Sequence, residues 1–142
     1  MTIRDVLITK GYRVITVTPH QTLHLALTTL VENKVGALVV QNAEGVSIGI
    51  ITERDLLREV YKGTEFRQMR VEEVMTREVV TGNPNQDVAF AMAAMTEGRF
   101  RHLPILQDGA LVGIVSIGDI VKSKLQHVEE EVTQYKDFMA LD

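Results

Sequence analysis

The sequence predicts a mixed α/β fold, with two tandem β-α-β-β-α units packed about a pseudo-twofold axis and a C-terminal helix after them. The first reason is an internal repeat, because Val14–Pro19 matches Val79–Pro84 at an offset of 65 residues. A second match, of Gly49–Leu57 with Gly113–Val121, has an offset of 64 residues. The second reason is that apolar residues follow the same order of strand and helix spacings in both copies. A repeat of this length implies two copies of one supersecondary unit.

Each copy begins with a strand candidate, at Val14–Val17 and at Val79–Thr81, which runs into a proline suited to the first turn of a helix. The helix that follows has one apolar stripe at spacings i, i+3, i+4 and i+7, as expected for one buried face. The stripe consists of Leu23, Ala26, Leu27 and Leu30 in the first copy and of Val88, Ala91, Met92 and Met95 in the second.

Two more strands and a second helix complete each copy. Pro104 has no N–H to donate, so its strand should begin or edge a sheet. The second helix should begin near Asp55 in the first copy and near Asp119 in the second. The strands are expected at Ala37–Val40, Ile48–Ile51, Leu103–Leu106 and Leu111–Val115.

A short helical lead-in precedes each copy, at Ile3–Leu7 and at Val71–Met75. We therefore divide the chain into a first repeat with its lead-in (1–60), a charged linker (61–70), a second repeat (71–125) and a C-terminal helical extension (126–142).

A long helix is predicted from Lys122 to Asp142. Its apolar residues recur at spacings of three and four, and this stripe extends beyond the second repeat. It should therefore pack on this chain or on a second subunit. The stripe contains Leu125, Val128, Val132, Tyr135 and Met139.

Composition excludes several classes of protein. Cysteine is absent, so there is no disulfide framework and no thiolate metal site. No apolar run approaches the roughly 20 residues that span a bilayer, and no signal peptide is recognisable, so we expect a cytoplasmic protein without a membrane partner. The net charge of −4 argues against nucleic-acid binding. No nucleophile–base set and no phosphate-binding glycine loop is recognisable, so we expect no catalytic residues and no enzyme.

The repeated motifs resemble the cystathionine β-synthase (CBS) domain pair, or Bateman module, as found in stand-alone bacterial proteins, over roughly residues 1–125. Three signatures carry the resemblance in both copies: the strand-to-proline start, the strands at Val35–Val40 and Arg101–Ile105, and the Gly-apolar-apolar-Thr/Ser-x-x-Asp corners. The resemblance implies a two-repeat disc that senses adenine nucleotides or related ligands between its repeats and commonly dimerises.

The corners provide the first ligand-binding candidates, Thr52 with Asp55 and Ser116 with Asp119. A carboxylate at a helix start can accept hydrogen bonds from a vicinal diol such as that of ribose. The hydroxyl three residues earlier can reach sugar or phosphate, and a helix N-terminus favours an anion. The same pattern also caps helices, and the two roles can coexist.

Lys34, Arg99, Arg101 and His102 form the only concentrated basic group. In the family, positions matching Arg101 and His102 commonly reach the ligand phosphate; the alternative is a solvated positive strand end. The first copy has Gly36 at the position of Arg101 and no side-chain donor there.

If the cross-repeat arrangement of the family holds, the two sites are unequal. Thr52 and Asp55 would share a pocket with the basic strand end, whereas Ser116 and Asp119 would face Val35–Ala37, where an adenine ring can approach closely. The full set of ligand-binding candidates is Thr16, Val35, Gly36, Ala37, Thr52, Asp55, Thr81, Arg99, Arg101, His102, Ile114, Ser116 and Asp119.

The sequence thus predicts a regulatory module that binds an adenosine-containing ligand: AMP, ADP, ATP, NAD(H) or S-adenosylmethionine. It should form a homodimer, signal to a separate effector protein and require no cofactor. The alternative is a structural dimerisation module without a ligand. His20 and His24 have a metal-capable helical spacing, but no third ligand is recognisable, so we expect no metal site.

Overall fold

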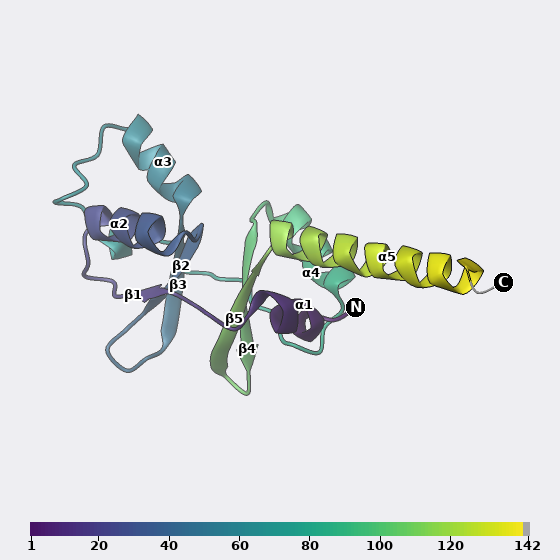
Figure 1. Ribbon diagram of the computed structural model, residues 1–142. Helices are drawn as coiled ribbons and strands as arrows, with labels where there is room; N and C mark the ends of the chain where they lie inside the picture. The colour runs from purple at the N-terminus through teal and green to yellow at the C-terminus, as the bar shows by residue number, and fades with distance from the viewer. Residues whose placement is uncertain (141–142) are drawn as a thin grey trace. The chain divides into compact units, whose positions relative to one another are not determined.

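The computed structural model describes residues 1–140, which form two compact units, each built on a small sheet (Figure 1). The central unit contains Arg13–Thr81. The terminal unit contains Met1–Tyr12 and the chain from Gly82 onward. The predicted fold class is confirmed, because helices and strands alternate in the expected mixed α/β order.

The central unit has a three-stranded sheet in the order β1-β2-β3, with β1 parallel and β3 antiparallel to β2. The terminal unit has the antiparallel pair β4-β5. The elements are α1 (Ile3–Lys10), β1 (Thr16–Val17), α2 (Leu23–Asn33), β2 (Ala37–Gln41), β3 (Ser47–Thr52), α3 (Glu53–Tyr61), the 3-10 helix η1 (Val71–Glu73), α4 (Val88–Gly98), β4 (His102–Gln107), β5 (Ala110–Ser116) and α5 (Ile117–Ala140).

Each unit has its own hydrophobic core. The predicted helix stripes are buried at their first, second and fourth positions, whereas Leu27 lies at the border of its stripe and is exposed. The central core contains Val17, Leu23, Ala26, Leu30, Leu38, Val40, Ile51, Leu56, Val71 and Met75. The terminal core contains Ile3, Val6, Leu7, Val88, Ala91, Met95, Leu103, Ile105, Val115 and Ile120.

The two lead-ins are exchanged between the sequence repeats. Helix α1 precedes the first repeat but packs on β5 of the second, where a Cβ at Gly113 would lie 2.7 Å from Leu7 Cδ2. The segment after η1 precedes the second repeat but packs on β3 of the first. A Cβ at Gly49 would lie 2.6 Å from Met75 Sδ and 2.9 Å from the Thr76 carbonyl oxygen. Both glycines occupy the same repeat position, so each lead-in requires a residue without a side chain there.

The prediction of a strand at Val79–Thr81 is wrong, because these residues form no strand. Next to them, Gly82 forms a single parallel bridge to Ile105 of β4. In the first copy, the Val39 N–H donates to the Ile15 carbonyl oxygen at 3.2 Å, which lengthens the parallel pairing of β1 with β2. The second copy has Pro104 at the matching position. Since proline has no N–H, this hydrogen bond cannot form and the parallel ladder stops. Pro104 thus lies inside β4. Among the described residues, the edge of β4 that faces Gly82 has only this isolated bridge.

The two repeat prolines precede their helices and do not lie in the first turns, contrary to expectation. Pro19 and Pro84 each lie three residues before an N-cap, Thr22 and Asp87. These two side chains accept hydrogen bonds from first-turn N–H groups at 3.1 and 2.8 Å. The helices begin where a side chain satisfies the otherwise unpaired N–H groups.

The segment 61–70, interpreted as a linker, is packed on the central unit. Phe66 and Met69 lie partly buried against the core. Their carbonyl oxygens accept hydrogen bonds from the N–H groups of His24 and Leu23, both at 2.9 Å. The segment thereby covers the start of α2.

The last helix starts earlier than Lys122, because α5 runs without a break from Ile117 to Ala140. Its first turns are anchored in the terminal unit by Ile120 and Ser123, and residues 124–140 are exposed. Figure 1 shows α5 extending past α1 and α4. The final two residues of the predicted helix lie outside the described residues. Within residues 1–140, no helix is both long and apolar enough to cross a membrane.

The close approach of α1 to β5 makes Gly113 intolerant of a side chain. We expect Gly113→Ala to destabilise the protein by about 1–3 kcal/mol, because the new methyl group overlaps Leu7. Urea denaturation measures the loss. Gly118→Ala is the matched control, since a Cβ there meets only Ser116 Oγ at an ordinary 3.6 Å. Equal stability of the two variants would contradict the packing described here.

Candidate functional site

The first corner joins β3 to α3 through a reciprocal cap. Thr52 is the N-cap, and its backbone N–H and hydroxyl donate to Asp55 Oδ2 at 2.9 and 3.1 Å. In return, the Asp55 N–H donates to Thr52 Oγ1 at 3.3 Å. Asp55 Oδ1 lies 3.3 Å from an Arg58 guanidinium nitrogen, and that arginine is largely exposed.

The second corner repeats this geometry between β5 and α5. The Ser116 N–H donates to Asp119 Oδ2 at 2.8 Å, and the Asp119 N–H donates to Ser116 Oγ at 3.0 Å. This corner also contains a cation, because Lys10 Nζ of α1 lies 2.7 Å from Asp119 Oδ2 and donates to the Ile114 carbonyl oxygen. Lys10 is a functional candidate that the sequence reasoning missed, since only the exchanged packing of α1 places it there.

Two opposing effects set the pKa of Asp119. Partial burial raises its pKa, but the hydrogen bond from Lys10, the hydrogen bonds from Ser116 and the Lys10 charge together outweigh burial. The net pKa of Asp119 therefore lies below its ordinary value. The carboxylate stays ionised through the neutral range and is held by an internal counter-ion.

A third copy of the same cap lies outside the repeated corners. Thr2 and Asp5 form a capping box at the start of α1, with the Thr2 N–H donating to Asp5 Oδ2 at 2.8 Å. The backbone and side-chain hydrogen bonds from Thr2 lower the pKa of Asp5. Asp5 is exposed, whereas the side chains of Asp55 and Asp119 are only 14% and 25% exposed. The Thr/Ser-x-x-Asp motif alone therefore marks a helix cap. The two repeated corners differ from the cap at Thr2 in that their carboxylates are more buried.

Each corner lies beside the strand of its own repeat. Ala37 pairs with Thr52 in the sheet, and the Gly36 carbonyl oxygen accepts a hydrogen bond from the Glu53 N–H at 3.0 Å. Val35, just before them, is half-buried. The central corner is thus bordered by small residues.

The terminal corner has the basic residues at the same places. His102 pairs with Ser116, and the Arg101 carbonyl oxygen accepts from the Ile117 N–H at 3.0 Å. Directly opposite residues of paired strands place their side chains on the same face. His102 and Ser116 are therefore neighbours, and Arg101 is exposed next to the N-terminus of α5.

The remaining candidate residues lie outside the caps of the two strand-to-helix corners. Arg99 is the left-handed C-cap of α4, with φ 58°, and is exposed. Thr16 is exposed in β1, and Thr81 is exposed just before the Gly82 bridge. Ile114 is buried in β5, so its backbone, which accepts from Lys10, is the part available to a neighbour.

The candidates divide between the two units. The shared pocket expected for Thr52 and Asp55 with Arg101 and His102 joins residues of different units and stays a prediction. The central unit contains Thr16, Val35, Gly36, Ala37, Thr52, Asp55 and Thr81, and the terminal unit contains Arg99, Arg101, His102, Ile114, Ser116 and Asp119.

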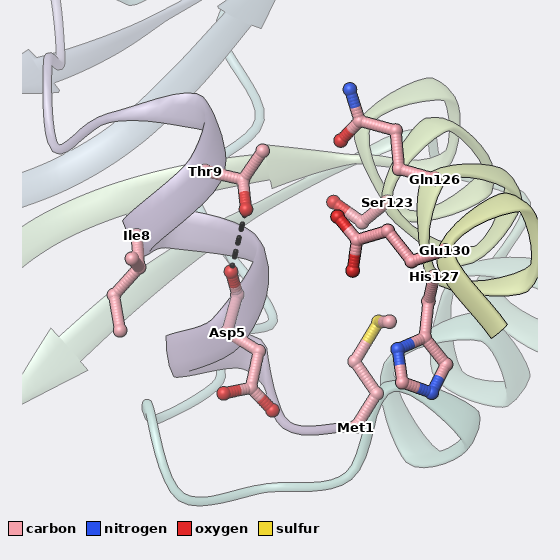
Figure 2. A pocket seen from close by; sticks show the side chains of 8 residues that line it. All are labelled: Met1, Asp5, Ile8, Thr9, Ser123, Gln126, His127 and Glu130. Atoms are coloured by element: carbon pink, nitrogen blue, oxygen red, sulfur yellow. Dashed lines mark hydrogen bonds between the residues drawn. The ribbon is translucent and has the colours of Figure 1, made fainter. Parts of the chain in front are cut away.

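Each unit has a pocket among its described residues. One has a volume of about 220 Å³, which is small for a whole nucleoside. It is lined by Asp55, Arg58, Glu59, Lys62, Met69, Glu73 and Val74. The other, of about 450 Å³, lies between α1 and α5 and contains none of the predicted site residues (Figure 2).

Comparison with known proteins agrees with this architecture. The CBS domain model matches residues 3–62 and 71–125. The CBS domain-containing protein YhcV of Bacillus subtilis is 38% identical over 116 residues, which are 81% of this chain and 81% of that protein. The crystal structure of a CBS-domain containing protein from Agrobacterium tumefaciens superposes with a TM-score of 0.82 at 43% identity, covering 87% of this chain and 92% of that one. The chain belongs to the CBS domain family.

Two more distant structures of the same fold contain ligands. A CBS domain protein from Pyrobaculum aerophilum, complexed with AMP, has a TM-score of 0.76 at 22% identity and covers 84% of this chain and 89% of that one. The CBS domain pair of protein MJ0100, in complex with 5-methylthioadenosine and S-adenosyl-L-methionine, has a TM-score of 0.77 at 24% identity and covers 86% of this chain and 94% of that one. At these identities, the likeness to this chain concerns the fold.

The Lys10–Asp119 pair should make stability depend on pH. Because the folded pKa of Asp119 is lowered, the pair contributes stability above the ordinary value of 3.8 and loses it as pH falls through the folded pKa. We expect Lys10→Met to cost about 1 kcal/mol at pH 7 and less at pH 3. Urea denaturation at both pH values measures this, with the exposed Lys34→Met as control. A cost independent of pH would contradict the ion pair.

Proposed function

We propose that this chain is a non-enzymatic regulatory module that binds an adenosine-containing ligand through its two corners. The ligand class comprises AMP, ADP, ATP, NAD(H) and S-adenosylmethionine. The module acts as a homodimer and passes the signal to a separate effector protein. Membership of the CBS family supports a regulatory role, and the adenosine-type ligands of the two distant relatives are compatible with this class.

The geometry of the caps carries the proposal. In both corners, the hydrogen bonds that the aspartate side chain accepts within the cap end on its Oδ2. Oδ1 accepts none of these cap hydrogen bonds, and in Asp55 it pairs with an exposed arginine that a ligand can displace. A carboxylate can therefore close its helix with one oxygen and accept a ribose hydroxyl with the other. Ligand exchange leaves the fold intact because the cap is not broken.

The two corners differ in their charges, and this should make the sites unequal. Asp119 already has Lys10 as a counter-ion, whereas the cation beside Asp55 is the largely exposed Arg58. A neutral diol gains more from a carboxylate that is not already held by an ammonium group. We therefore propose Asp55 as the stronger ribose acceptor. A ligand at Asp119 must share the carboxylate with Lys10.

Ligand binding should stabilise the fold. At a hundredfold excess over its dissociation constant, AMP should add about 2.7 kcal/mol to the free energy of unfolding. Asp55→Ala and Asp119→Ala should each weaken binding at one site, by roughly 1.5–3 kcal/mol if the lost hydrogen bond is charge-assisted. Thermal unfolding with AMP, ATP, NADH and S-adenosylmethionine, followed by calorimetry, measures both effects.

Asp5→Ala is the matched control, because it removes the same kind of cap from a helix outside the repeated corners. It should lower stability and leave AMP affinity unchanged. If all three aspartate variants bind like wild type, the carboxylates are helix caps alone. No stabilisation by any of the four ligands would favour the alternative, a ligand-independent dimerisation module.

Phosphate recognition should depend on Arg101. Arg101 is exposed, its backbone borders the N-terminus of α5, where an anion is favoured, and the first copy has Gly36 at this position. We expect Arg101→Ala to weaken AMP binding by roughly tenfold and to change adenosine binding little, since adenosine has no phosphate. Parallel titrations of both ligands test this. Equal losses for both would mean that Arg101 does not contact phosphate.

A double-mutant cycle identifies the corner that shares a ligand with Arg101. The family resemblance favours coupling of Arg101→Ala with Asp55→Ala, across the repeats. The pairing of β4 with β5 brings the residue after Arg101 next to Ser116, and this favours coupling of Arg101→Ala with Asp119→Ala. Residues that contact one ligand show non-additive effects on its affinity, whereas separate sites add.

A further inference from the structure

Helix α5 has an apolar face that nothing in its own unit covers. Six apolar residues on this face are 44–65% exposed. A helix that projects alone is marginally stable in water, because helices in proteins gain most of their stability from packing an apolar face. The six residues are Val121, Leu125, Val128, Val132, Tyr135 and Met139.

The six residues follow a strict heptad pattern. Their spacings are four, three, four, three and four, which is the a/d repeat of a coiled coil. With Leu125 as position a, the other a positions are Val132 and Met139. The d positions are Val121, Val128 and Tyr135.

The heptad face and the face that packs on α1 lie on different sides of α5. Figure 2 shows Ser123, Gln126, His127 and Glu130 lining the pocket toward α1. At 3.6 residues per turn, the centre of the heptad face lies roughly 140° around the helix from the buried Ile120 and Ser123. The heptad face is therefore open to a partner while α5 stays docked on α1.

The charges beside this face select the partner and its direction. The e positions are Lys122, Glu129 and Lys136, and two g positions are Lys124 and Glu131. In a parallel pair, each g residue faces the e residue five positions later on the other helix. For a second copy of α5, Lys124 then meets Glu129 and Glu131 meets Lys136. Both contacts join opposite charges, and symmetry doubles them.

An antiparallel pair of the same length is disfavoured by the same residues. Full overlap would place Leu125 opposite Tyr135 of the second copy. In that register e faces e and g faces g, so Glu129 would meet Glu129 and Glu131 would meet Glu131. Lys122 would also meet Lys136. These contacts all join like charges, which repel.

We propose that α5 forms a parallel, in-register coiled coil with α5 of a second copy of this chain. This deepens the homodimer of the proposed function and specifies its contact surface. The coiled coil places the two terminal units at the same end of the assembly, because the helices run in the same direction. It does not depend on nucleotide binding, so the two proposals can fail separately.

The absence of native cysteine allows a direct test. In the parallel register, Leu125→Cys places two thiols opposite each other, within the Cα separation that a disulfide bridges. In the antiparallel register they would be about 15 Å apart. We expect oxidised glutathione to convert full-length Leu125→Cys into a disulfide-linked dimer, as seen on non-reducing gels. Asp137→Cys, at an outward f position, is the control and should crosslink at least tenfold more slowly.

Two results of this experiment would overturn the proposal. One is equal crosslinking of Leu125→Cys and Asp137→Cys, which would mean that the heptad face is not an interface. The other is crosslinking of Leu125→Cys to Tyr135→Cys in a mixture of differently tagged chains, without Leu125→Cys homodimers. That outcome would make the pair antiparallel.

A charge swap tests the register independently of the apolar contacts. In the Leu125→Cys background, Glu131→Lys should slow crosslinking several-fold, because it places two lysines opposite each other. Adding Lys136→Glu restores opposite charges and should restore the rate. If the double variant stays as slow as the single one, Glu131 and Lys136 do not face each other across the dimer. AMP titration of the same variants shows whether the nucleotide site is intact.

Discussion

The strand-to-helix corner is the constraint on which the candidate site depends. In each repeat, the aspartate three residues after the end of the strand accepts a hydrogen bond from the backbone N–H of the last strand residue. The hydroxyl of that last strand residue caps the helix in return. This reciprocal bond fixes where the strand ends, where the helix begins and where the carboxylate lies. Since the same group closes the fold and faces outward through its other oxygen, structural and ligand-binding roles are compatible at one residue.

The exchange of lead-ins makes the two repeats interdependent. The segment before the first repeat packs on the sheet of the second, and the segment before the second packs on the sheet of the first. Neither sequence repeat can therefore bury its own core from its own residues alone. The exchange also makes the corners unequal, because α1 delivers Lys10 to Asp119. The segment after η1 has Arg77 near its end, and this residue donates to the Glu72 carbonyl oxygen.

Pro104, which stands where the first copy has Val39, shows how one missing hydrogen-bond donor changes the topology of a sheet. The first copy has a three-stranded sheet and the second a two-stranded one, although their sequences align. The difference follows from the N–H that Val39 donates and Pro104 lacks. Gly82 retains the two hydrogen bonds that do not involve this donor, at 2.9 Å each. The backbone thus keeps the register of the missing strand while losing the strand itself.

The sequence by itself determined the local elements, the repeat and the corner residues, because these depend on periodicity and on contacts three or four residues apart. The helix stripes led by Leu23 and Val88 and the caps at Thr52 and Ser116 are of this kind. Only the tertiary structure decided which lead-in packs on which repeat and that Lys10 holds Asp119. It also decided that residues 61–70 cover α2 and that the stripe of α5 stays uncovered within its unit. These outcomes depend on contacts between residues far apart in the chain, where several pairings satisfy the same pattern and only close packing chooses among them.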